Sequence, residues 1–185
     1  MMKNSDWPKW AVESIEVAPP NPEWIDAGRA EVKELMQRLG PFGVKEVEHV
    51  GSTSIRDLPA KPIIDVMAKI SSFDEVDEIA GILAGDQWHY VPAELDNRPW
   101  RRFFIKVEDD KRVAHLHLML EGELRWEQQR IFRDCLNGDS SLKEEYAELK
   151  KRLAIQFPDD REAYSDGKTA FIQRVLDGSE AEDFF

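Results

Sequence analysis

The segment HVGSTSIRDLPAKPIIDV combines residue types suited to binding phosphate. Gly51, Ser52 and Thr53 follow a short apolar stretch, and a turn of small residues can present backbone N–H groups and hydroxyls to a phosphate. Such a turn is common on its own. Here a β-branched stretch follows and carries Asp65, a carboxylate placed to hold the cation that accompanies phosphates. The segment therefore predicts a site for a phosphorylated ligand and a divalent cation.

Two stretches with strand character would add polar groups to this site. Side chains alternate between the faces of a strand, so PIIDVMAKI places Asp65 and Met67 on the face opposite its aliphatic residues. In the same way VAHLHLML places His115 and His117 together on one face. If both strands belong to one sheet, the aspartate and the two histidines gather on its second face.

A hairpin partner is expected to contribute an arginine. WRRFFIKV precedes the histidine strand, and EDDK between them has the polar residues of a hairpin loop. Placing Phe103 and Ile105 on the buried face fixes the parity of the register. Arg102 is then expected beside His117, on the site face.

These residues suggest two kinds of chemistry, weighed against an ordinary solvated sheet face. In the functional interpretation, Lys61 and Arg102 neutralise phosphate charge. Asp65 binds the metal, and His115 and His117 complete its shell or act as acid and base. The metal would be Mg or Mn, or Zn, because carboxylates suit magnesium whereas imidazoles suit transition metals. Alternatively, the histidines touch only substrate and Asp65 holds a weak magnesium.

Other polar positions are better explained by structure. His49 is as readily a packed, loop-orienting residue as a catalytic one, and Tyr164 with Lys168 suggests helix packing with an exposed amine. Cys135 suits a buried helix position. The run KEEYAELKKR is typical of a solvated helix.

The order of elements predicts an α+β fold, a mixed sheet with packed helices and a helical C-terminal third. Amphipathic helices are expected from Pro22 to Leu39 and after Ser72, ending at Gly85. Strands are expected over 44–50, 61–70, 88–92, 100–107 and 112–120. Three helices should follow from about residue 125, broken near 137–138 and at 158.

Composition limits the class of protein. The 185 residues fit one domain, expected over 15–177 after an extension (1–14) and before an acidic tail (178–185). A net charge of −12 disfavours generic nucleic-acid binding but allows a local basic pocket. The single cysteine fits a reducing compartment, and the sequence has neither a signal-peptide core nor a run long enough to cross a membrane. A cytoplasmic protein is expected.

Several motifs together resemble the GrpB family, over roughly residues 15–177. They are HVGSTS, LPAKPIID, RRFF, HLH, FRD and the segment from Tyr146 to Arg152. GrpB proteins are similar in fold to the nucleotidyltransferase superfamily, whose signature is a Gly-Gly or Gly-Ser turn followed by an Asp-x-Asp strand, with a third carboxylate on a neighbouring strand. The resemblance therefore implies a nucleotidyltransferase-like fold.

Carried over residue by residue, Gly51-Ser52 matches the turn and Asp65 the first carboxylate. Met67 stands at the second carboxylate position, and His115 or His117 is expected near the third. Arg56-Asp57 replaces the Pro-Gly that the family usually has. The resemblance implies a metal-dependent nucleotidyltransferase acting on a nucleotide or another phosphorylated small molecule. The alternative is a catalytically inactive binding or adaptor domain that lost the second metal with position 67.

Overall fold

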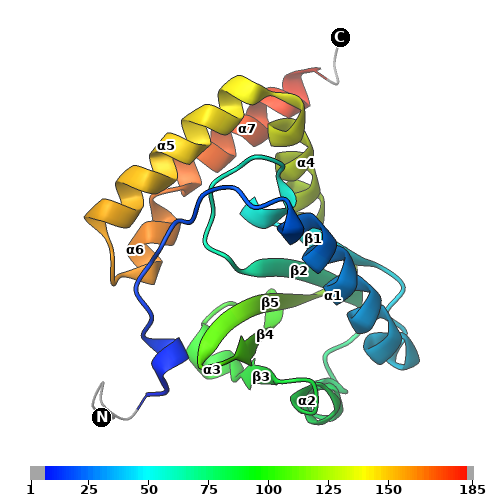
Figure 1. The fold of residues 1–185 in the computed structure, drawn as a ribbon. Helices are drawn as coiled ribbons and strands as arrows, with labels where there is room; N and C mark the ends of the chain where they lie inside the picture. The colour runs from blue at the N-terminus through cyan, green and yellow to red at the C-terminus, as the bar shows by residue number, and fades with distance from the viewer. Residues whose placement is uncertain (1–6, 183–185) are drawn as a thin grey trace.

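A five-stranded mixed sheet forms the centre of the molecule in the computed structural model, which describes residues 7–182 (Figure 1). Its strands lie in the order β1-β2-β5-β4-β3; β2 and β5 are parallel, and the other neighbours are antiparallel. The strands are β1 (Val47–Val50), β2 (Ile64–Ile70), β3 (Trp88–Val91), β4 (Arg101–Glu108) and β5 (Lys111–Leu120). The expected α+β fold is confirmed.

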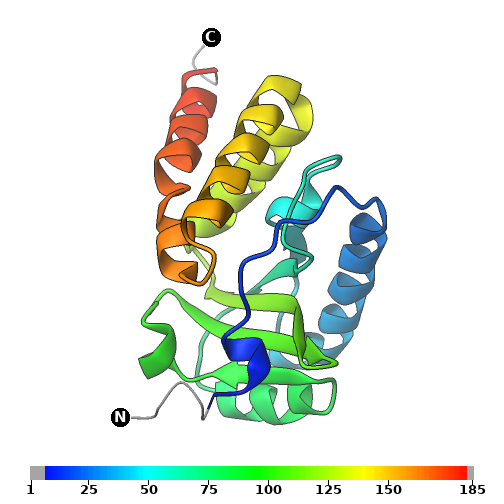
Figure 2. The ribbon, with the colours of Figure 1, turned by 60° about the vertical axis from the view of Figure 1, so that its left-hand side comes forward.

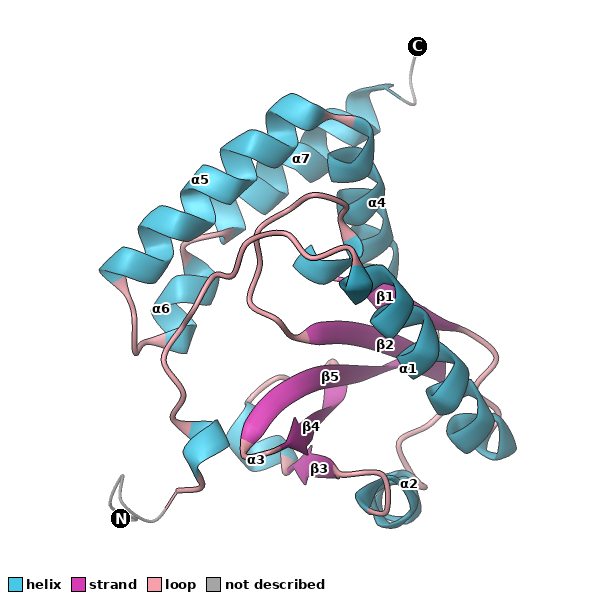
Figure 3. Ribbon diagram, viewed as in Figure 1, coloured by secondary structure: helices cyan, strands magenta, loops and turns pink. Residues whose placement is uncertain are grey.

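The helices form two groups (Figures 2 and 3). In the first half of the chain they are α1 (Glu23–Leu39), α2 (Val76–Ala84) and the short α3 (Ala93–Asp96). The C-terminal group comprises α4 (Leu124–Gly138), α5 (Ser140–Gln156), α6 (Arg161–Asp166) and α7 (Thr169–Glu182). Among the described residues, none of these helices is long and apolar enough to span a membrane.

One face of the sheet packs against α1 and α2 to form the main core. The side chain of Asn21 accepts a hydrogen bond from the backbone N–H of Glu23 at the start of α1. Leu35 and Leu39, one turn apart, are fully buried against the sheet. The aliphatic residues of β2 and β5, including Val66 and Leu116, complete this core as their alternation predicts.

The opposite face of the sheet meets the C-terminal helices, and one part of it stays polar. Met67 and Met119 pack there against Trp126 of α4. The helices have their own core, which includes Phe132, Tyr146 and Phe171. The polar part of the face lies between the sheet and this second group of helices, and it holds the candidate site.

The expected register of the β4–β5 hairpin is wrong by one residue. Asp109 and Asp110 form the loop, both with positive φ, as in a two-residue hairpin turn. If the ladder continued regularly from this turn, the strands would pair in the expected register. A β-bulge between Lys106 and Val107 shifts the register by one residue. Because a slip of one residue exchanges the faces of a strand, Arg101 rather than Arg102 lies on the site face.

Two other expectations differ from the structure near the C-terminus. The third expected helix is split into α6 and α7 around Gly167, whose neighbouring Leu153 side chain leaves no room for a Cβ atom. In addition, α7 continues to Glu182, beyond the expected boundary at Asp177. The remaining tail residues, 183–185, lie outside the described part of the chain.

The corrected register predicts a contrast in stability between neighbouring residues. Phe104 is fully buried in the core, so Phe104→Ala should lower the free energy of unfolding by about 3–5 kcal/mol. Arg102 is half-buried over the Phe73 ring, so Arg102→Ala should lower it by about 1 kcal/mol or less. Urea unfolding would measure both. The bulged register would be contradicted if Phe104→Ala hardly changed the free energy of unfolding and Arg102→Ala lowered it strongly.

Candidate functional site

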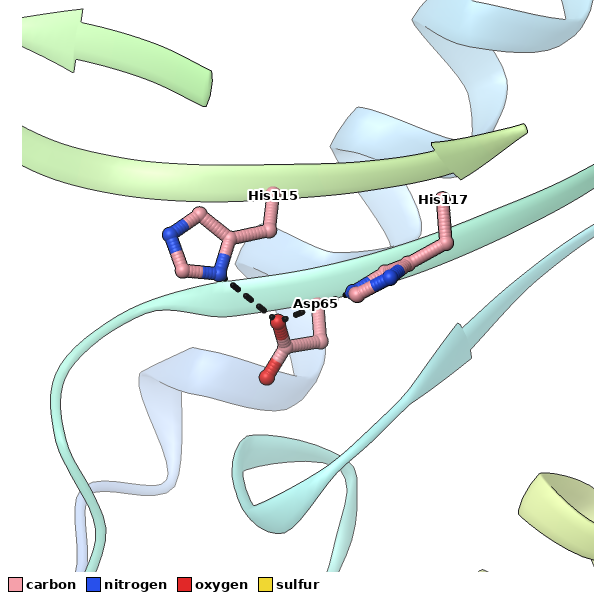
Figure 4. A group of neighbouring side chains, drawn as sticks. All are labelled: Asp65, His115 and His117. Atoms are coloured by element: carbon pink, nitrogen blue, oxygen red, sulfur yellow. Dashed lines mark hydrogen bonds and ion pairs between the residues drawn. The ribbon is translucent and has the colours of Figure 1, made fainter. Parts of the chain in front are cut away.

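Asp65, His115 and His117 meet at the centre of the polar face (Figure 4). Asp65 on β2 lies directly opposite His115 on the parallel strand β5. One carboxylate oxygen of Asp65, Oδ1, lies 3.1 Å from His115 Nδ1 and 3.5 Å from His117 Nε2. One potential ligand atom from each residue lies within 4.8 Å of the others. Parallel pairing of two short motifs thus produces the three-residue cluster.

The electrostatics of this cluster favour an ionised carboxylate between neutral imidazoles. Burial alone would raise the pKa of Asp65, but the hydrogen bonds from His115 and His117 outweigh it and hold the pKa well below its usual value. Burial lowers the pKa of His115 to about 4 and also lowers that of His117. The carboxylate is therefore available to a cation at neutral pH.

Arg101 joins the cluster in the position that had been expected for Arg102. Its guanidinium makes two hydrogen bonds to the carboxylate of Asp96, at 2.9 and 2.6 Å, and a third at 2.5 Å to His117 Nδ1. The side chains of Arg101 and Asp96 are 7% and 5% exposed, respectively, so the pair is fixed within the protein. Arg102 points to the other face of the sheet.

The glycine-serine turn lies against the aspartate. Gly51 has φ of +70°, and a Cβ atom placed there would lie 2.6 Å from Asp65 Oδ2. Both the backbone conformation and the close approach require glycine. Ser52 lines the cleft. The turn is thus held directly over the carboxylate.

Thr53 does not line the cleft with Ser52. It is buried and donates a hydrogen bond to the backbone carbonyl of Ile63, while His49 Nε2 lies 2.9 Å from its hydroxyl oxygen. Because the hydroxyl proton is used on Ile63, His49 must be the donor. Burial lowers the pKa of His49 to about 4, which keeps it neutral. Among the alternatives considered for His49, the structure supports the loop-orienting role.

Three lysines lie on the helical side of the site, and none forms an ion pair with a carboxylate of the described chain. Two of them, Lys61 and Lys150, line the cleft. Within residues 7–182, Lys61, Lys150 and Lys168 form no ion pair within 4.0 Å; each amine instead lies 4.7–5.1 Å from the ring centre of Tyr146 or Tyr164. Lys150 is 1% exposed and donates to the carbonyl of Pro59. Burial, followed by repulsion from the other lysines, lowers the pKa of Lys61 to about 8 and that of Lys150 to about 7.

A cavity of about 610 Å³ connects the carboxylate, the turn, Lys61 and Lys150. Six basic and three acidic side chains line it, although the whole chain carries a net charge of −12. The basic residues are Lys61, Arg98, Arg101, Arg112, Lys150 and Arg161. At the far edge, Arg112 donates to the carbonyl of Trp10 and Arg161 pairs with Glu13, both in the N-terminal segment. The cavity is thus a basic cleft in an acidic protein.

The structure therefore brings together Gly51, Ser52, Lys61, Asp65, His115 and His117 and leaves out Thr53 and Arg102. Sequence reasoning missed Arg101 because of the bulge. It also missed Lys150, which was placed in a solvated helix. A signal was present, because Lys150 follows Tyr146 by four residues and precedes Leu153 by three, on the apolar stripe of α5. Lys168 is half-buried rather than exposed.

The sheet and the helices that pack on it have a nucleotidyltransferase-like fold. The structure is similar to that of the Cid1 poly(U) polymerase, with a TM-score of 0.55 and 14% identity over 80% of this chain and 49% of that chain. The family model described as GrpB protein matches residues 14–178. The chain belongs to the GrpB family.

The chain is also similar to other proteins of known sequence or structure. The crystal structure of conserved protein GrpB from Enterococcus faecalis has a TM-score of 0.79 and 27% identity, covering 92% of this chain and all of that one. UPF0157 protein YqkA from Bacillus subtilis is 33% identical over 86% of this chain, which spans 45% of YqkA. A dephospho-CoA kinase from Mycolicibacterium paratuberculosis is 23% identical over 81% of this chain and 42% of its own length.

Proposed function

We propose that this protein binds a nucleotide or another phosphorylated small molecule in the basic cleft, together with a divalent cation, and acts as a nucleotidyltransferase. The observation that carries the proposal is a group of three lysines, one fully buried and two half-buried, that form no ion pair with a carboxylate of the described chain. A buried, unpaired ammonium group is costly, and an anionic ligand would supply the missing counter-charge. Phosphate groups fit a cleft whose other end holds a glycine-serine turn.

Each part of the cleft then has a role toward the ligand. Ser52 and the backbone at Gly51 bind one phosphate, and Lys61 and Lys150 neutralise the charge of the next. Arg101 contributes positive charge in the place that sequence reasoning gave to Arg102. The ionised Asp65 holds the cation that accompanies the phosphates.

The residues fit one metal ion better than two. Asp65, His115 and His117 offer a carboxylate and two imidazoles, a donor set suited to a transition metal such as Mn or Zn. Met67 occupies the second carboxylate position and is fully buried, so no bridging carboxylate is present there for a pair of ions. A bound metal would polarise a phosphoryl oxygen. In the alternative, in which the histidines contact only the substrate, Asp65 would hold magnesium only weakly.

A second function, binding without turnover, follows from the same observation at Met67. An inactive domain would retain the basic cleft and the turn but lack the second ion. This chain matches 42% of the length of a dephospho-CoA kinase, and we therefore add dephospho-CoA as a candidate ligand. This molecule, like ATP, carries an adenosine nucleotide with linked phosphates.

Thermal shift and calorimetry with ATP, UTP, GTP and dephospho-CoA, each with Mg²⁺ or Mn²⁺, would test binding, since a ligand specific for the folded state raises its stability. Release of pyrophosphate from a bound triphosphate would then distinguish the transferase from the inactive binder. Asp65→Asn should abolish metal-dependent binding. His89→Ala, at a histidine of β3 outside the cleft, serves as a matched control. No shift with any ligand at millimolar concentration would contradict the proposal.

The lowered lysine pKa values predict proton uptake on binding. Lys61 and Lys150 titrate near 8 and 7 in the free protein, and an anion beside them should raise both pKa values. At pH 8 the complex should therefore take up protons, and affinity should fall as pH rises from 7 to 10. Calorimetry in buffers with different ionisation enthalpies would measure the uptake. Proton release instead would show that the ligand does not contact these amines.

A further inference from the structure

We infer that Arg101, clamped by Asp96, determines which nitrogen of His117 carries the proton, and thereby holds His117 as a hydrogen-bond donor to Asp65. Arg101 is thus a positioning residue that opposes the use of His117 as a metal ligand. This inference deepens the proposed function and relies on it only for the metal; the position of the proton can be measured without any ligand.

The clamp restricts the guanidinium on several sides. Asp96 engages Nε and Nη2 in a bidentate pair, and the planar group lies 3.9 Å from the centre of the Phe103 ring. A planar fork held in this way has little rotational freedom. Its remaining nitrogen, Nη1, is directed at His117 Nδ1.

The chemistry of the donor then fixes the histidine. A guanidinium has only donors and stays protonated, so Nδ1 of His117 must accept. A neutral imidazole carries one N–H, which must therefore be on Nε2, 3.5 Å from Asp65 Oδ1. Trp100 lies nearly parallel to the His117 ring, with centroids 6.3 Å apart. Arg101 thus selects the tautomer, while Trp100 lies alongside the ring.

This arrangement is the opposite of the one around most metal-bound histidines. Such a histidine normally offers a bare nitrogen to the metal and donates its other N–H to an acceptor. At His117 the outer neighbour is a donor, and the nitrogen facing Asp65 carries the proton. Coordination through Nε2 would therefore require Arg101 to release Nδ1. His115 has no such constraint, since its Nδ1 faces Asp65 and its Nε2 is buried with no hydrogen-bond partner among the described residues.

Nitrogen-15 NMR of the metal-free protein at pH 7.5 would read the tautomer directly. We expect His117 to be protonated at Nε2 in the wild type. In Asp96→Asn/Arg101→Met, which removes both members of the buried ion pair, the proton should move toward Nδ1. Arg102→Met, on the opposite face of the same strand, is the control and should leave the tautomer unchanged. A wild-type His117 protonated at Nδ1 would overturn the inference.

Zinc titration by calorimetry would test the consequence for metal binding. Zn²⁺ alone should bind the double variant about tenfold more tightly than the wild type, and adding His117→Ala should remove the gain. Unchanged or weaker binding in a variant with a native amide spectrum would contradict the inhibitory role of Arg101. If neither wild type nor variant binds Zn²⁺, the proposed metal site fails, and the NMR result alone decides the inference about the tautomer.

Discussion

Lys150→Met should stabilise the protein while weakening its binding of phosphorylated ligands about a hundredfold or more, by analogy with truncation of a buried charge partner. Methionine has a similar length and carries no charge, so it removes an ammonium group that is 1% exposed and unpaired by any carboxylate of the described chain. We expect a gain of about 1–3 kcal/mol in the free energy of unfolding at pH 7, after allowing for the lost hydrogen bond to Pro59.

Lys151→Met is the matched control for this experiment. Lys151 is the next residue of α5, half-exposed and paired with Glu148, so its replacement should change stability by less than about 0.5 kcal/mol and leave binding unchanged. Chemical unfolding and calorimetry with the best nucleotide would measure both variants. A destabilised Lys150→Met protein with normal affinity would show that the amine supports the fold rather than a ligand.

Gly51→Ala should abolish both metal and phosphate binding. The added methyl group would lie 2.6 Å from Asp65 Oδ2 and force the carboxylate out of the cluster. The positive φ adds backbone strain of about 1–3 kcal/mol. Calorimetry with Mn²⁺ and with nucleotide would measure the loss of binding, and thermal unfolding would measure the strain.

Gly43→Ala separates the two effects. Gly43 also has a positive φ, +83°, but no atom outside its immediate neighbours lies within 4 Å of an added Cβ. The Gly43→Ala protein should therefore be strained, although less than Gly51→Ala because ψ is 5° at Gly43 and −173° at Gly51, and it should bind normally. If Gly51→Ala retained its affinity, the turn would not belong to the site.

The sequence was sufficient to predict which side chains share a face of the sheet where polar and aliphatic residues alternate strictly. Asp65, His115 and His117 interrupt aliphatic stretches at every second residue, so their common face followed from strand geometry alone. It was insufficient at β4, because RRFF has the same kind of residue at successive positions and both registers bury a phenylalanine. The bulge that decides between them has no signature in these residues.

The basic side of the cleft depends on tertiary contacts that sequence patterns do not specify. Lys61 lies in a loop, Lys150 in α5 and Lys168 in the turn between α6 and α7, and they meet only when α5 packs beside the glycine-serine turn. Periodicity could place Lys150 on the buried stripe of its helix. It could not show that Lys61 would face the same cavity or that Lys168 would lie close to both amines.

The doubled Arg101-Arg102 and Phe103-Phe104 pairs make the hairpin tolerant of insertion and deletion. Deleting one residue of β4 beside the bulge, such as Lys106, would slide the rest of β4 by one position along β5. Arg102 and Phe104 would then replace Arg101 and Phe103 beside the histidines, leaving the cleft with the same residue types. Only the fixed spacing from Asp96 to its arginine would be lost. In most binding sites such a change in length would abolish binding. Here it would alter the arginine contact to His117 but keep the residue types that line the cleft.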